Sequence, residues 1–125
     1  MSRRAAITGW GKCVPPVSLS NADLEQLMDT SDEWIVERTG ISCRQLSHVE
    51  MTDLAELAAR RALACSGMDA EELDLVVIAT CTPEILCPSV AAMVQDRIGA
   101  TNAGAFDLNA ACSGFVYGTS VVAGM

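Results

Sequence analysis

The residue best placed to do chemistry is Cys112, which lies between a strand-like stretch and an apolar helical pattern (residues 106–115, FDLNAACSGF). A cysteine at such a turn is near the unpaired N–H groups and the positive end of the helix, which favour a thiolate and can hold an oxyanion. The small residues around it leave space for an acyl group. This pattern suits nucleophilic acyl transfer. On these residues alone, a buried structural cysteine fits equally well.

The other five cysteines occur at irregular intervals, and no C-x-x-C pair is present. Cys81 and Cys87 are six residues apart, a spacing that matches no common zinc site. In a reducing cytosol most free cysteines are small buried hydrophobic residues. The sequence also has no glycine-rich phosphate loop. It therefore predicts neither a metal site nor a bound cofactor.

Trp34 and Arg38 form a second candidate pair, because they are four residues apart in a predicted helix and share one face. Core packing for the tryptophan and a solvated helix end for the arginine are the ordinary alternatives. The one histidine in the sequence, His48, precedes a predicted helix, and we interpret it as a surface or loop residue.

The strands that would position Cys112 are short apolar runs separated by helices. Residues 73–80, with the core LVVIA, and residues 104–109 are the clearest strands, and residues 5–9 and 41–46 are shorter candidates. Continuous apolar strands that alternate with helices indicate an α/β fold with a largely parallel sheet and helices on both faces.

Capping residues delimit the predicted helices. The expected N-caps are Ser20 (in a capping box with Asp23), Thr30, Thr52 and Ser89, and the expected stops are Gly40, Gly67 and Gly99. The helices are expected at residues 21–28, between Thr30 and Gly40, at residues 53–64, from Ser89 to Ile98, and from about Cys112 onward.

Composition narrows the classes of partner. The chain has 125 residues, is 50% hydrophobic and carries a formal net charge of −8, and its eight basic residues form no stripe of the kind that nucleic acid requires. No apolar run approaches the roughly 18–20 residues that span a bilayer. The N-terminus reaches Gly9, Trp10 and Lys12 too early for a signal peptide. We therefore expect a cytoplasmic location.

Four blocks, in this order, resemble the 3-oxoacyl-acyl-carrier-protein (ACP) synthase III family, also called β-ketoacyl-ACP synthase III, of thiolase-like condensing enzymes. The blocks are residues 21–24 (NADL), residues 29–41 (DTSDEWIVERTGI), Ala79-Thr80 with Pro88-Ser89, and residues 107–115. Together the resemblance covers essentially the whole chain. It implies the N-terminal half of a thiolase-like fold.

The resemblance also implies an activity and residue roles. Cys112 matches the active-site cysteine that takes an acyl group from acyl-CoA, after which decarboxylative condensation with malonyl-ACP gives 3-oxoacyl-ACP and initiates fatty acid synthesis. Trp34 matches the tryptophan that stacks on the adenine of CoA, Arg38 an arginine near the CoA phosphates, and Thr30 a residue beside the same nucleotide. An aromatic plane and a guanidinium fork suit adenine and phosphate.

Cys87 stands where the family often has a bulky residue that lines the acyl pocket of the partner subunit. A small thiol there predicts room for a longer or branched acyl starter, although a neutral packing change fits as well. The test is whether the complete enzyme turns over longer or branched acyl-CoA.

The histidine and asparagine that complete catalysis in the family are expected beyond Met125. We therefore expect residues 1–125 to be a truncated N-terminal half-domain, inactive alone, of an enzyme that works as a homodimer with acyl-CoA and ACP and binds neither nucleic acid nor membrane. Two alternatives stay open: a related condensing acyltransferase of secondary metabolism, and a non-catalytic thiolase-like fragment or subunit.

Overall fold

The computed structural model describes residues 5–125, which form two compact units. Within the described residues, the first unit comprises residues 5–13 and Glu50–Met125, and the second comprises Val14–Val49. Residues 1–4, on which part of the signal-peptide argument rests, lie outside the described residues. No helix in the described part of the chain is long and apolar enough to cross a membrane.

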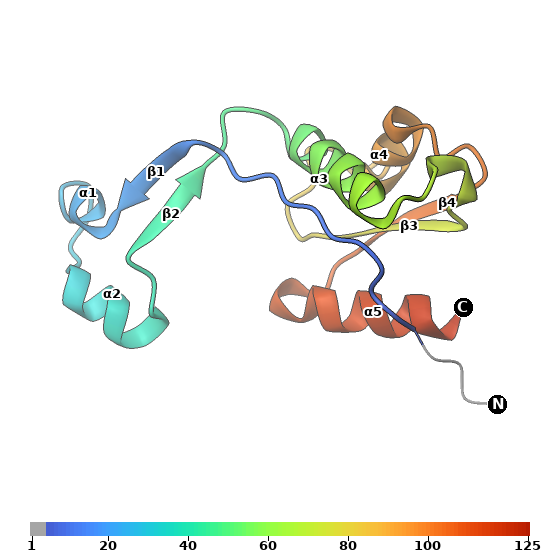
Figure 1. Cartoon of the computed structure of the whole chain (residues 1–125). Coiled ribbons are helices and arrows are strands. Elements are labelled where there is room, and N and C mark those ends of the chain that lie inside the picture. The colour runs from blue at the N-terminus through green and yellow to red at the C-terminus, as the bar shows by residue number, and fades with distance from the viewer. Residues whose placement is uncertain (1–4) are drawn as a thin grey trace. The chain divides into compact units, whose positions relative to one another are not determined.

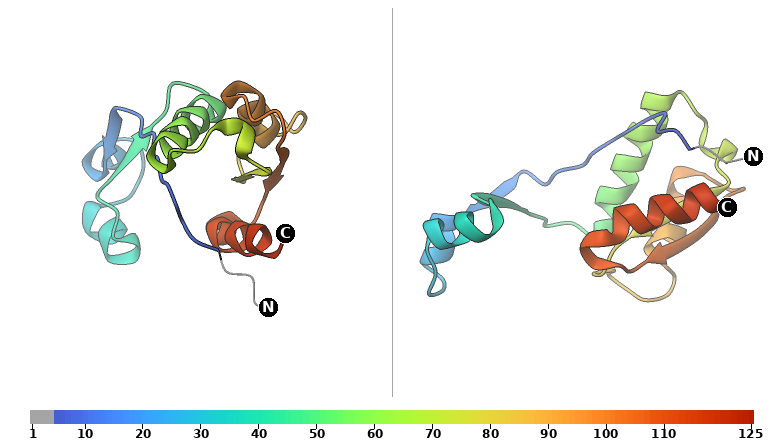
Figure 2. Two further views of the ribbon diagram at one scale, coloured as in Figure 1. Left: turned by 45° about the vertical axis from the view of Figure 1, so that its right-hand side comes forward. Right: turned by 90° about the horizontal axis from the view of Figure 1, so that it is seen from below.

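The first unit is built on a parallel pair of strands, β3 (Leu75–Ala79) and β4 (Gly104–Leu108). In this pair Leu75 is opposite Gly104, and Ala79 is opposite Leu108. Figures 1 and 2 show α3 (Met51–Ser66) and α4 (Val90–Ile98) on one side of the pair and α5 (Gly114–Gly124) on the other. A short 3-10 turn, η1 (Ala70–Glu72), precedes β3. The expected α/β layers, with helices on both faces of parallel strands, are confirmed.

The core of the first unit lies along α4. Val90, Val94 and Ala100 are fully buried, and Ile98 is nearly so. Partly buried side chains of α3 and β3, including Leu63 and Val76, pack against them. The apolar residues of α4 are buried because the strands cover one of its faces and α3 covers another.

The second unit pairs β1 (Val17–Ser20) with β2 (Cys43–Leu46) in antiparallel fashion and carries α1 (Asn21–Glu25) and α2 (Asp32–Thr39). The side chain of Asn21, which is 1% exposed, organises it. Its Nδ2 donates to Asp32 Oδ1 at 2.7 Å and to the Ile41 carbonyl at 2.8 Å, and its Oδ1 accepts from Arg44 Nη2 at 2.7 Å. One buried amide therefore holds both helices to the strand pair.

Several expected boundaries are confirmed. Ser20 and Asp23 form the capping box of α1, and Ser89 caps α4 by accepting from the Ala92 N–H at 3.1 Å. The predicted stops at Gly40, Gly67 and Gly99 all have left-handed backbones, with φ of 71°, 70° and 81°.

Other boundaries were wrong. The N-cap of α2 is Ser31 rather than Thr30, and α3 begins after Glu50, so Thr52 is its second residue and not its cap. The helix expected at residues 21–28 ends at Glu25. The local pattern thus placed the cap of α2 one residue too early, the cap of α3 two residues too late, and the end of α1 three residues too late.

Residues 5–9 form no strand, contrary to the sequence prediction. The segment passes over α3 instead, where a Cβ on Gly9 would lie 2.5 Å from the Ala62 carbonyl oxygen and a Cβ on Gly11 would lie 2.2 Å from that of Ala58. The glycines therefore serve close contact with a helix backbone. In residues 5–125 this apolar run has no strand partner.

Candidate functional site

Cys112 lies in η2 (Ala111–Ser113), a single 3-10 turn between β4 and α5, and its side chain is exposed. The α-helix itself begins at Gly114, two residues after the position expected from sequence. Within the turn the Ser113 N–H donates to the Ala110 carbonyl at 2.9 Å, and the Gly114 N–H donates to that of Ala111. Within the described residues, Cys112 is therefore not part of the core.

The residue before the cysteine has an unusual backbone. Ala111 has φ of +43°, and it is the non-glycine residue of the described chain with positive φ. Such a conformation costs an L-residue with a Cβ about 1–3 kcal/mol and persists only where the surroundings hold it. The turn that presents Cys112 is therefore strained and must be supported from both sides.

Support on the helix side comes from a close approach of α5 to β3. Gly114 is buried, and a Cβ placed on it would lie 2.9 Å from the Ala79 Cβ. On the strand side the Leu108 carbonyl accepts from the Thr80 N–H at 3.0 Å, which extends the pairing of β3 and β4 by one bond. The small residues that the sequence places around Cys112 thus serve packing of the turn as well as access to the thiol.

Asp107, the fourth residue of β4, adds a contact to a third element. Its Oδ2 accepts from the Val90 N–H at 2.9 Å and its Oδ1 from the Ala91 N–H at 2.8 Å. These are the first two residues of α4, whose N–H groups have no partner within the helix. Asp107 therefore caps α4 from a different element. Its partner helix could not be read from the sequence.

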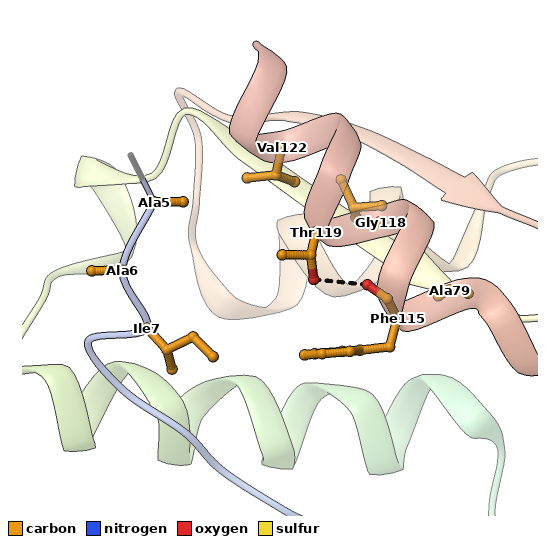
Figure 3. A pocket seen from close by; sticks show the side chains of 10 residues that line it. Ala5, Ala6, Ile7, Ala79, Phe115, Gly118, Thr119 and Val122 are labelled. Carbon is orange, nitrogen blue, oxygen red and sulfur yellow. Dashed lines mark hydrogen bonds between the residues drawn. The ribbon is translucent and has the colours of Figure 1, made fainter. Parts of the chain in front are cut away.

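An apolar pocket lies beside the start of α5 (Figure 3). The side chains of Ile7 and Phe115 point toward the space between the N-terminal segment and the helix. The one hydroxyl in its lining, that of Thr119, donates to the Phe115 carbonyl at 2.7 Å and is therefore used within α5. Among residues 5–125, the side chains that line this pocket are uncharged, and they offer hydrophobic contact. Its lining residues are Ala5, Ala6, Ile7, Val77, Ala79, Gly114, Phe115, Gly118, Thr119 and Val122.

Cys87 lies in the segment between β3 and α4, and it is exposed. Leu86 beside it is 92% exposed. Because Cys87 follows β3 and Cys112 follows β4, both cysteines come after the carboxyl ends of parallel strands, where α/β sheets bind ligands. The structure shows a hollow at this edge that the sequence analysis did not predict, although residues that directly follow parallel strands are a signal for such a site. It is lined by Thr80, Cys81, Pro83, Leu86, Ser89, Asp107 and Asn109.

Glu84 holds the same segment to α3. Its Oε1 accepts from the Thr52 N–H at 2.5 Å, at the N-terminus of that helix. Burial on its own would raise the pKa of Glu84, but hydrogen bonds from Thr52 and from its own backbone together hold that pKa below 4.5. Thr52 Oγ1 and Glu84 Oε2 are buried and, among the described residues, make no hydrogen bond of normal geometry. The carboxylate rather than the predicted threonine hydroxyl therefore caps α3.

In the second unit, Trp34 and Arg38 do meet on one face of α2. The guanidinium carbon of Arg38 lies 4.8 Å from the centre of the Trp34 ring, in a cation–π arrangement. Trp34 is 53% exposed, so it is not a core residue. Thr30 is half-buried and lines a shallow hollow with Asp29, Ser31 and Trp34. The structure thus brings together the three residues expected to bind a nucleotide.

Among the described residues, neither a histidine nor a metal-binding cluster forms part of the candidate site. His48 is exposed in the loop between β2 and α3, as expected. Across residues 5–125, no group of three His, Cys, Asp or Glu side chains is arranged to hold a metal ion.

Comparison with known proteins gives consistent results. No protein-family model matches the chain. It is 58% identical over 114 residues to β-ketoacyl-ACP synthase III 2 of Vibrio cholerae, covering 91% of this chain and 32% of that protein. It is 52% identical over 127 residues to β-ketoacyl-ACP synthase III of Roseiflexus castenholzii, covering 100% of this chain and 38% of that protein.

Solved structures agree. The crystal structure of 3-oxoacyl-ACP synthase III from Aquifex aeolicus matches with a TM-score of 0.88 and 44% identity over 93% of this chain and 38% of that one. The priming β-ketosynthase of the R1128 polyketide pathway matches with a TM-score of 0.90 and 36% identity over 98% of this chain and 37% of that one. The chain spans about a third of the length of the curated relatives it matches. Over that third, the chain is similar in sequence to β-ketoacyl-ACP synthase III enzymes and shares their thiolase-like fold.

Proposed function

We propose that the protein is a β-ketoacyl-ACP synthase III that uses Cys112 as its nucleophile. The thiolate attacks the thioester carbonyl of acyl-CoA, and CoA leaves as the thiol. Malonyl-ACP then loses CO₂, and the resulting carbanion attacks the cysteine thioester to give 3-oxoacyl-ACP and the free thiol. The observation that carries this proposal is the exposed thiol of Cys112 on a strained strand-to-helix turn, in a chain similar to these enzymes.

The nucleotide end of acyl-CoA would bind to α2. The Trp34 ring offers a plane for adenine, and Arg38 offers a guanidinium fork for phosphate. Thr30 contributes to the hollow beside Trp34. Support comes from the exposure of Trp34 and from the 4.8 Å contact that holds Arg38 against it.

The later half of the reaction requires groups that bind the malonyl thioester and promote loss of CO₂. His48 is exposed in a loop of the second unit and is not a candidate for that role. We propose that a histidine and an asparagine outside residues 1–125 supply it, so residues 1–125 alone are inactive. We also propose a cytoplasmic homodimer, with Cys87 beside the acyl pocket of the partner subunit.

A related condensing enzyme of secondary metabolism is the second candidate. The observation that favours it is the match to the R1128 priming β-ketosynthase, whose TM-score of 0.90 is no lower than that of the Aquifex enzyme. Exposed Cys87 fits either candidate, because a small residue leaves room for a longer or branched starter.

The two candidates are separated by substrate assays on the product of the complete reading frame. A panel of acetyl-CoA, branched acyl-CoA and longer acyl-CoA is combined with malonyl-ACP from fatty acid synthesis. Formation of 3-oxoacyl-ACP supports the main proposal. Acylation of the enzyme without condensation onto that carrier would indicate a different acceptor and so favour the second candidate. The absence of both steps would refute both candidates.

A further inference from the structure

We propose that Asp107 is a positioning residue for Cys112. Its carboxylate holds the end of β4 to the start of α4 and thereby fixes the strained turn that presents the thiol. The proposal rests on the proposed role of Cys112 as the nucleophile. It assigns Asp107 no contact with substrate.

The contacts of Asp107 differ from those of an ordinary helix cap. The local N-cap of α4 is Ser89, whose hydroxyl accepts from the Ala92 N–H at 3.1 Å. Asp107 lies on a different element, and its two oxygens accept from the Val90 and Ala91 N–H groups at 2.9 and 2.8 Å. Val90 and Ala91 are fully buried, so their backbone N–H groups cannot form hydrogen bonds with water instead if the carboxylate is removed.

Asp107 is close enough in the chain to govern the turn. Only four residues lie between it and Cys112, and they include Ala111 with its φ of +43°. A strained residue keeps its conformation only while both flanks are fixed. On the helix flank, Gly114 packs against Ala79. On the strand flank, the end of β4 is fixed by three hydrogen bonds. The Leu108 carbonyl accepts one from the Thr80 N–H, and the Asp107 carboxylate accepts two from α4.

A direct catalytic role for Asp107 fits the geometry less well. Both carboxylate oxygens are occupied by backbone N–H groups, which disfavours proton transfer by either. The residue therefore acts through the backbone. A displacement of the thiol by about 1 Å can cost a reaction on the order of 100-fold, so a positioning role has a measurable effect.

The test compares Asp107→Ala and Asp107→Asn with Ser89→Ala in the product of the complete reading frame. All three variants weaken the N-terminus of α4, but only the Asp107 variants release the end of β4. The readouts are the melting temperature, the rate of Cys112 acylation by acyl-CoA, and the rate of Cys112 alkylation by iodoacetamide from pH 6 to 10, followed on the Cys112 peptide.

We expect Asp107→Ala to slow acylation by about tenfold or more and to change the pH profile of alkylation, since both depend on where the thiol is held. Asp107→Asn retains one acceptor oxygen and should recover part of the rate. Ser89→Ala should lower the melting temperature comparably and leave acylation within about twofold of wild type.

Equal rates for Ser89→Ala and Asp107→Ala would overturn the proposal. If Asp107→Ala does not fold, the near-isosteric Asp107→Asn carries the comparison. If wild-type Cys112 accepts no acyl group, the proposed function fails, whereas the alkylation rates of the same variants still decide whether Asp107 positions the thiol.

Discussion

Gly114 and Ala79 meet so closely that a Cβ on Gly114 would lie 2.9 Å from the Ala79 Cβ. Gly114 has φ of −54° and ψ of −44°, an ordinary helical backbone that alanine also adopts. The glycine is therefore required by contact and not by conformation. This contact packs the first turn of α5, which begins two residues after Cys112, against the end of β3.

Gly114→Ala should destabilise the protein by about 1–3 kcal/mol, because the added methyl overfills a packed contact. It should also slow acylation of Cys112 by displacing the turn. Unfolding in urea and acylation rate measure the two effects. The control is the double variant Gly114→Ala with Ala79→Gly, in which the opposing Cβ is gone. If the double variant loses as much stability as the two single variants lose in sum, the contact between these two residues is not the cause.

Glu84→Gln should cost about 1 kcal/mol near pH 7, because the carboxylate caps α3. The pKa of Glu84 is lower in the folded protein than its ordinary value of 4.5, so the charged group stabilises the fold above about pH 4.5. That contribution is lost as the pH falls through the folded-state pKa. The difference between variant and wild type should therefore shrink in acid.

Glu50→Gln is the matched control for Glu84. Glu50 occupies the N-cap position of the same helix, but its side chain makes no capping hydrogen bond. Urea unfolding from pH 3 to 7 should show a smaller effect of Glu50→Gln, with less dependence on pH. A loss from Glu84→Gln that is the same at every pH would contradict the electrostatic explanation.

Trp34→Ala should raise the Kd for CoA by roughly tenfold, as expected when one aromatic platform for a base is removed. Arg38→Lys keeps the charge but loses the planar fork that lies 4.8 Å from the ring, and it should also weaken binding. Calorimetric titration of CoA measures both. Glu37→Gln, which changes a charge on the same helix, should bind as wild type does. Unchanged affinity in Trp34→Ala would exclude α2 from the nucleotide site.

Features that depend on neighbouring residues in sequence were predictable. The capping box of Ser20 with Asp23 and the stops at Gly40 and Gly99 follow from local hydrogen bonding and from the freedom of glycine at positive φ. β3 and β4 were predictable because each is a continuous apolar run. The contact of Trp34 with Arg38 follows from their spacing on one helix.

Features that depend on distant residues were not predictable. β1 has the sequence VSLS, a weak strand signal, and it exists because β2 pairs with it. Asp107 caps a helix that begins 17 residues earlier, and Glu84 caps one at Thr52, 32 residues earlier. The strained backbone of Ala111 was not predictable either, because alanine favours an ordinary helix.

Formation of a thioester on Cys112 tests the central claim most directly. The product of the complete reading frame is mixed with acyl-CoA, and intact mass and peptide mapping are recorded for wild type, Cys112→Ala and Cys87→Ala. Wild type and Cys87→Ala should each gain one hydroxylamine-sensitive acyl group on the Cys112 peptide, and Cys112→Ala should gain none. An acyl group on another residue, or none in wild type, would contradict the account.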